Sequence, residues 1–133
     1  TPVILRNQVV TGVLLYKALR IEVRNLLALE EGAPGDVIRL QDGRLLLTYG
    51  RRVPPFGVQG MLSSDDGKTW DENNRILLTA DSGIDQGYPS TIQRDDGAIV
   101  TVYYSSELHI RRRPRPEVLG IHGAAVIYRP EHL

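Results

Sequence analysis

Cysteine is absent from the 133 residues, which excludes disulfide scaffolds, zinc–thiolate sites and thiol catalysis. A surplus of either charge is also absent: 16 Lys and Arg balance 16 Asp and Glu, whereas nucleic-acid-binding domains usually carry a basic surplus. No apolar run approaches the roughly 20 residues of a membrane-spanning helix, and the first residues lack the pattern of a signal peptide. We therefore expect a soluble globular chain that binds neither nucleic acid nor a membrane, and its compartment stays open.

Short apolar runs separated by thirteen Gly and eight Pro dominate the chain, a pattern typical of all-β proteins. Runs 36–41 and 44–49 flank Asp42-Gly43, and a second unit of the same form spans 90–104. Asp-Gly between two such runs is a strong hairpin signal, because Gly accepts the positive φ of a primed turn. The sequence thus predicts two β-hairpins.

The two hairpins superpose with an offset of 54 residues, the separation of Asp42 from Asp96. With this offset Ile38 coincides with Ile92. Short strands that recur at such a period indicate the blades of a β-propeller, which contain four strands each. Three further strands are expected at 58–63, 75–79 and 121–128.

The N-terminal part allows two interpretations. Runs 13–16 and 20–29 fit the last strands of a preceding blade, whereas 18–31 also fits a helix because its apolar residues recur at helical spacing. Near the other end, 105–120 is expected to be a solvated basic loop. We therefore divide the chain into 1–35 as a partial or remodelled blade or a cap, 36–80 as one blade, and 81–133 as the final blade.

One segment, 63–70, reads Ser-Ser-Asp-Asp-Gly-Lys-Thr-Trp and fits the pattern S-x-D-x-G-x-T-W. In such a turn Ser and Asp accept backbone N–H groups, Gly supplies an unusual φ and Trp buries its ring. The pattern resembles the Asp box, or BNR repeat, of sialidases and related β-propellers. The resemblance covers 36–104, extends more weakly to residue 130, and implies a partial propeller of about two to two and a half four-stranded blades. It implies a structural role for Ser63, Asp65, Gly67, Thr69 and Trp70.

The resemblance also implies a candidate nucleophile. Sialidases are retaining glycosidases that use Tyr, because a neutral phenol approaches a sugar bearing its own carboxylate more readily than an anion does. Tyr88, in Gly-Tyr-Pro-Ser at 87–90, stands at the matching place, although Pro89 departs from the enzymes' pattern. The alternative is that Tyr88 packs at the propeller axis without catalysis.

Sialidases also hold the substrate carboxylate with arginines, whose guanidinium groups donate bidentate hydrogen bonds. Arg51 or Arg52 matches one of these arginines, and both being solvated loop residues is the alternative. Gln59 and Asp85 are expected on the same side as ligands of sugar hydroxyls. A general base for Tyr88 would be a carboxylate, and the candidates are Glu30, Glu31 and Glu107.

No counterpart of the family's acid/base Asp precedes residue 36, and a six-bladed propeller needs well over twice this length. We therefore expect a sialidase-like carbohydrate-binding or relict propeller protein without turnover by the single chain. The alternative is an exo-sialidase-type hydrolase whose site is completed by oligomerisation.

Uncovered blade faces and sheet edges predict a homo-oligomer, a ring of two or three chains, unless 1–30 caps one face. We expect no metal and no other cofactor, because the histidines lack a metal-ligand spacing; they are His109, His122 and His132.

Overall fold

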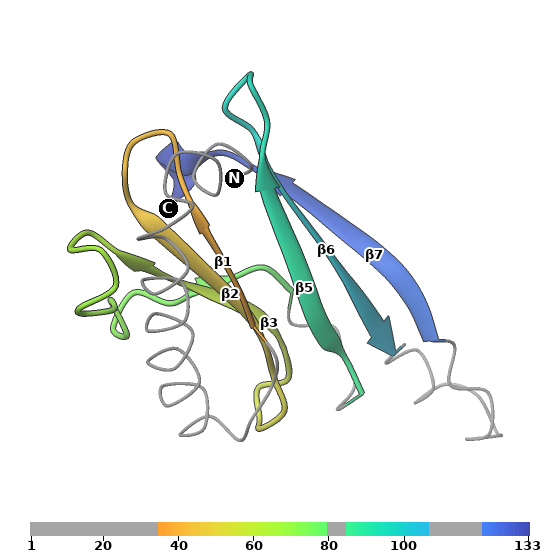
Figure 1. Cartoon of the computed structure of the whole chain (residues 1–133). Helices are drawn as coiled ribbons and strands as arrows, with labels where there is room; N and C mark the ends of the chain where they lie inside the picture. The colour runs from red at the N-terminus through yellow and green to blue at the C-terminus, as the bar shows by residue number, and fades with distance from the viewer. Residues whose placement is uncertain (1–34, 80–84, 107–120) are drawn as a thin grey trace, which may run out of the picture.

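The computed structural model describes residues 35–79, 85–106 and 121–133, whose strands form two antiparallel sheets (Figure 1). The first sheet contains, in spatial order, β1 (Gly35–Arg39), β2 (Leu45–Arg51), β3 (Gly57–Ser63) and β4 (Ile76–Leu77). The second contains β5 (Gly87–Gln93), β6 (Ile99–Ser106) and β7 (Ile121–Tyr128). The described residues contain no α-helix, only a 3₁₀ turn at Pro130–His132, so the prediction of an all-β fold is confirmed for this part.

Some predictions concern segments that the structure does not describe. The strand and helix interpretations of the N-terminal part fall within 1–34. Most of the basic loop falls within 107–120. These predictions lie outside the described residues.

The 54-residue repeat is present in the strand register. In the first hairpin Ile38 pairs with Leu46, and 54 residues later Ile92 pairs with Val100. The partners of residues 36, 37 and 39 are reproduced at the same offset. The agreement ends at Ser90, because a bulge between Gly87 and Ser90 shifts the register of β5. The two hairpins are therefore copies of one local structure up to that bulge.

Both hairpin turns are three-residue loops. In the first, the N–H of Gly43 donates to the carbonyl of Leu40 (2.9 Å), and the N–H of Leu40 donates to Arg44 (2.8 Å). Gly43 and Gly97 have φ of 93° and 85°. Asp42 and Asp96, which precede them, do not have a positive φ. The prediction of a primed turn is therefore wrong. A type I turn closed by one left-handed Gly forms instead, and Asp42 supports it by accepting the N–H of Arg44.

The fourth strand is shorter than predicted. The sequence predicts a strand at 75–79, but β4 contains two residues. The N–H groups of Leu78 and Thr79 both donate to the carbonyl of Val58, at 2.9 and 3.1 Å. Because one carbonyl receives two successive N–H groups, the ladder ends there.

The two sheets pack against each other, with β5 lying against β1 and β2. Ile38, Leu40 and Leu46 of the first sheet form a buried cluster with Ile99 of the second. Hydroxyl groups cross the same interface, because Thr91 is hydrogen-bonded to Thr48 (2.8 Å) and to Thr101 (3.0 Å). Thr101 in turn contacts the hydroxyl of Tyr128 at 2.9 Å. The buried hydroxyls of these three threonines thus each have a partner, as buried polar groups require.

The opposite face of the first sheet has its own core. Leu47, Tyr49 and Met61 are fully buried there, and Val37 and Trp70 pack against them. Trp70 is the last residue of the segment 63–70, so its half-buried ring anchors that turn to the sheet.

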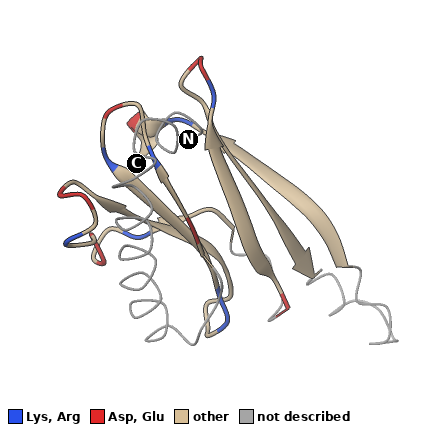
Figure 2. Cartoon of the chain, viewed as in Figure 1, with Lys and Arg blue, Asp and Glu red and all other residues tan. Residues whose placement is uncertain are grey.

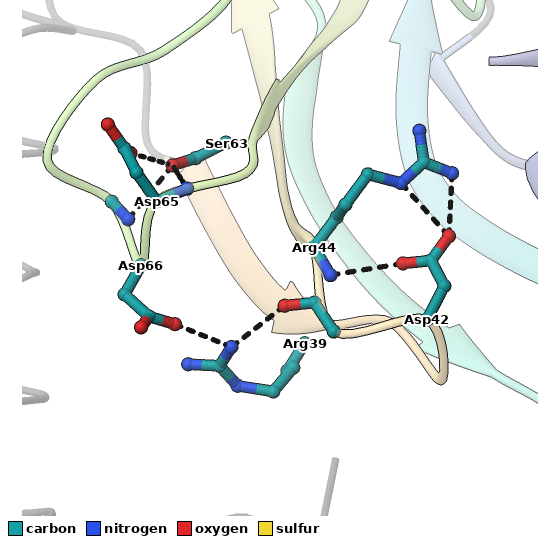
Figure 3. A network of polar contacts seen from close by, with 8 residues as sticks. Arg39, Asp42, Arg44, Ser63, Asp65 and Asp66 are labelled. Carbon is teal, nitrogen blue, oxygen red and sulfur yellow. Dashed lines mark hydrogen bonds and ion pairs between the residues drawn. The ribbon is translucent and has the colours of Figure 1, made fainter.

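The turn at 63–70 is held by its own side chains (Figure 3). The hydroxyl of Ser63 donates to Asp65 (2.8 Å) and accepts the N–H of Gly67 (2.9 Å). Asp65 also accepts the N–H and the hydroxyl of Thr69, at 2.8 and 2.6 Å. Outside this network, Asp66 pairs with Arg39 at 2.7 Å, which ties the turn to the first hairpin.

These bonds predict a specific dependence on pH. Donation by Thr69, with a smaller contribution from Ser63, lowers the pKa of Asp65 from its ordinary 3.8 to about 2. Because the folded pKa lies below the unfolded one, the ionised group stabilises the folded state above pH 3.8. That contribution is lost as the pH falls to about 2.

We expect Asp65→Asn to flatten the pH dependence of the urea midpoint between about pH 4 and pH 2. The measurement compares urea unfolding of both proteins across this range. An Asp65→Asn protein that loses as much stability on acidification as the wild type would contradict the assignment.

Candidate functional site

Four side chains converge where the ends of β2, β5 and β6 approach one another. Arg52 follows β2, Asp85 precedes β5, Tyr88 belongs to β5, and Tyr104 belongs to β6. We call these four residues the Arg52 cluster. Two sheets contribute to it, so its geometry depends on how they pack.

The guanidinium group of Arg52 is held from two directions. Its Nη2 donates to the hydroxyl of Tyr104 (3.1 Å), and its Nε donates to the carbonyl of Gln86 (3.4 Å). Its central carbon lies 6.0 Å from the centroid of the Tyr88 ring, at the limit of a cation–π contact. Within the described part of the chain these bonds use two of the five N–H groups of Arg52, so donors remain for an anionic ligand.

Tyr104 links the two charges of the cluster. Its hydroxyl donates to Asp85 at 2.6 Å while accepting from Arg52. The hydrogen bond to the Asp85 carboxylate raises the pKa of Tyr104, and burial adds to the rise, whereas Arg52 opposes it. Tyr104 is therefore a neutral phenol at physiological pH. Its hydroxyl connects the side chains of Arg52 and Asp85 and so fixes their positions relative to each other.

Tyr88 has an unusual backbone and a large exposed surface. Its φ is 48°, in the left-handed region that bulky residues rarely adopt, and 61% of the residue is exposed. The bulge in β5 lies between Gly87 and Ser90, and Pro89 has no N–H with which to continue the ladder. The ring of Tyr88 lies 5.8 Å from that of Tyr104, at an angle of 36°. Strain of this kind is typical of functional sites.

A close contact between the sheets places Arg52 beside Tyr88. The fully buried Gln86 donates from Nε2 to the carbonyl of Arg51 at 2.6 Å. Next to it, a Cβ added to Gly50 would lie 2.8 Å from the Cα of Gly87, closer than real Cβ atoms approach. Gly50 therefore allows the end of β2 to reach β5, which brings Arg52 into the cluster.

The structure thus brings together three of the residues predicted from the sequence, namely Arg52, Asp85 and Tyr88. Arg51 instead donates to the carbonyls of Val53 (3.3 Å) and Pro54 (3.5 Å) in the loop after β2. Gln59 is buried on the first sheet and accepts the hydroxyl of Tyr49 at 3.2 Å. The predicted general bases, Glu30, Glu31 and Glu107, lie outside the described residues.

Sequence reasoning missed Tyr104. One signal was available, because the 54-residue repeat aligns Tyr104 with Gly50. A large polar aromatic residue therefore stands where the first repeat has no side chain. Strand formation alone does not require a tyrosine at this position, since the first repeat forms the same strand with glycine there. The difference between the two repeats therefore points to a separate role for Tyr104.

Other kinds of site find no support in the described residues. Across residues 35–79, 85–106 and 121–133, no three His, Asp or Glu side chains come together as a metal site would require. The same residues contain no helix that is long and apolar enough to cross a membrane.

Comparisons with known proteins bear on the fold. No family model and no curated protein matches the sequence. A crystal structure of a protein of unknown function from Dyadobacter fermentans is similar, with a TM-score of 0.55 and 28% sequence identity. The match covers 72% of this chain and 24% of that one, so the chain spans about a quarter of that relative's length.

Proposed function

We propose that this chain is part of an Asp-box β-propeller and binds a sugar that carries a carboxylate, without turnover by the single chain. The observation that carries the proposal is the Arg52 cluster. In it, a guanidinium group held in place by Gln86 and Tyr104 lies beside the exposed ring of Tyr88, with Asp85 close by.

The stacking of the sheets supports the propeller. Ile38 and Leu46 lie on the face of the first sheet that the second sheet covers, and Ile99 lies on the covering face. At the 54-residue offset Ile99 corresponds to Leu45, which lies on the other face of the first sheet. The two repeats therefore stack in the same sense, front to back. Repetition of that step is how the blades of a propeller are arranged around an axis.

Each group in the cluster suits one part of an acidic sugar. The remaining N–H groups of Arg52 donate to a carboxylate, and the carboxylate of Asp85 accepts hydrogen bonds from sugar hydroxyls. The exposed ring of Tyr88 packs against the apolar face of a sugar ring. Because Asp85 repels anions that offer no hydroxyl groups, the cluster favours a ligand with both features.

Hydrolysis is the second candidate, and the strained, exposed Tyr88 favours it. A tyrosine nucleophile needs a carboxylate base within hydrogen-bond reach. Among the described contacts, the nearby carboxylate of Asp85 accepts from Tyr104. We therefore rank binding above turnover. Turnover of a fluorogenic sialoside that Tyr88→Phe abolishes would reverse this ranking.

The test is a titration of the isotope-labelled chain with the methyl glycoside of N-acetylneuraminic acid, followed by NMR. We expect Arg52→Ala to weaken binding tenfold or more, because a hydrogen bond to a charged group contributes about 1.5–3 kcal/mol. Arg52→Lys is expected to weaken it too, since Lys lacks the planar fork.

Two controls separate the proposal from non-specific attraction. Arg51→Ala removes the same charge one residue away and is expected to change affinity by less than about twofold. The methyl ester of the same sugar lacks the carboxylate and is expected to bind as weakly as the acid does to Arg52→Ala. Equal binding of acid and ester by the wild type would refute the proposal.

A further inference from the structure

Two opposite charges of the Arg52 cluster lie close together without pairing directly. Figure 2 shows a basic segment directly after β2 and an acidic one directly before β5, at the same end of the two sheets. Arg52 donates to the hydroxyl of Tyr104 (3.1 Å), and the same hydroxyl donates to Asp85 (2.6 Å). Among the ion pairs of the described residues, none joins Arg52 to Asp85. One oxygen atom therefore separates the two charges and keeps both within reach of one small ligand.

Both charged groups have unused capacity for hydrogen bonds. Within the described contacts, Arg52 uses two of its five N–H groups. The carboxylate of Asp85 accepts one hydrogen bond in the same set, although its two oxygens offer about four acceptor sites. Asp85 is exposed and Arg52 is half-buried. A guanidinium group that can bind an anion thus stands beside a carboxylate that can bind a cation.

The aromatic part of the cluster suits a cation as well. An aromatic face attracts a positive charge within about 6 Å of its centroid. The exposed ring of Tyr88 lies 5.8 Å from the ring of Tyr104, whose hydroxyl binds Asp85. The cluster thus offers a cation both a carboxylate and an aromatic ring.

We propose that the preferred ligand of the Arg52 cluster is zwitterionic, an acidic sugar whose amino group is free and protonated. The inference rests on the proposed function and specifies the ligand. Arg52 binds the carboxylate, while Asp85 and Tyr88 bind the ammonium group. The two protein charges are no further apart than the two hydrogen bonds of Tyr104 laid end to end. A carboxylate and an amine on opposite sides of one pyranose ring span a similar distance, so one sugar can bridge both.

The charge of the ligand accounts for the preference. A sugar with a carboxylate and an acetylated amine is an anion, which Arg52 attracts and Asp85 repels. A free, protonated amine turns that repulsion into attraction and leaves the contact with Arg52 unchanged. Because Asp85 is exposed, water weakens the effect. An exposed ion pair together with a cation–π contact corresponds to a gain in affinity of roughly three- to thirtyfold.

The test compares two sugars by NMR titration of the full chain at about pH 6, where an amine is protonated. One is the methyl glycoside of N-acetylneuraminic acid, and the other is that of neuraminic acid, which carries the free amine. The wild type is expected to bind the free amine at least about threefold more tightly. Asp85→Asn is expected to bring the ratio of the two affinities to about one, because Asn keeps an acceptor for Tyr104 but carries no charge.

A matched control removes the same charge elsewhere on the second sheet. Asp95 is exposed in the turn between β5 and β6, at the opposite end of β5 from Asp85. Asp95→Asn is therefore expected to keep the preference of the wild type for the free amine. Should Asp85→Asn fail to fold, as judged by circular dichroism, Asp85→Ser replaces it, because the hydroxyl of Ser also accepts from Tyr104.

Equal affinities of the wild type for the two glycosides would overturn the inference. So would a preference that Asp85→Asn retains or that Asp95→Asn loses. A failure of the proposed function looks different, since the N-acetylated acid and its methyl ester then bind equally well or neither binds, and that result overturns both. A wild type that prefers the acid to its ester but shows no preference for the free amine refutes the zwitterionic ligand alone.

Discussion

Ile38→Ala is expected to lower the free energy of unfolding by about 2–5 kcal/mol, whereas Ile92→Ala is expected to lower it by less than about 1 kcal/mol. The two residues hold the same place in successive repeats, with the same cross-strand register. Ile38 is 4% exposed and packs between the sheets, whereas Ile92 is 50% exposed. Removal of Ile38 therefore leaves a cavity that the surrounding residues cannot readily fill.

Urea unfolding of both variants tests this difference. The measurement is made at the same low protein concentration for both variants. Local strand propensity is matched, because both changes remove the same atoms from the same strand position. Equal losses for Ile38→Ala and Ile92→Ala would show that the second sheet does not cover the first in solution.

Gly50→Ala is the second change with a large expected effect, a loss of about 1–3 kcal/mol of stability from overpacking. The added Cβ would lie 2.8 Å from the Cα of Gly87 and 2.9 Å from Oε1 of Gln86. Backbone and a buried side chain are the obstacles, so the sheets must separate at this point. Arg52, two residues further along, would move away from Tyr88, and the variant is therefore expected to lose sugar binding as well.

Gly123→Ala is the matched control. No atom lies within 4 Å of a Cβ added at Gly123, and its φ lies outside the left-handed region. We expect a change of less than about 0.5 kcal/mol, or a small gain from the lower entropy of the unfolded chain. Thermal unfolding and the NMR titration measure both effects. A Gly50→Ala protein as stable as Gly123→Ala would contradict the close approach.

The local elements of the fold could be predicted because their signals are short-range. Asp42-Gly43 and Asp96-Gly97 mark both hairpins, and β3 and β7 lie where apolar runs predicted strands. Two details were wrong for physical reasons. The turns are three-residue loops with one left-handed residue, whereas primed turns are two-residue loops. The strand β4 ends early because Val58 accepts two N–H groups.

The candidate site was only partly predictable. Tyr88, Arg52 and Asp85 were named from a resemblance, yet their meeting depends on Gly50 and Gln86 joining the two sheets. Tyr104 was missed because its role comes from a contact with Arg52, 52 residues earlier in the chain. No pattern within one strand encodes such a contact.

By itself the sequence determined the strands, their pairing within each hairpin and the 54-residue repeat, since turn chemistry and alternation act over a few residues. Only the tertiary structure decided which of two equivalent residues in the two repeats is buried. Ile38 and Ile92 have the same local structure and opposite environments. The difference arises because burial depends on which sheet packs on a strand, and the packing of one sheet on another is decided between residues far apart in the chain.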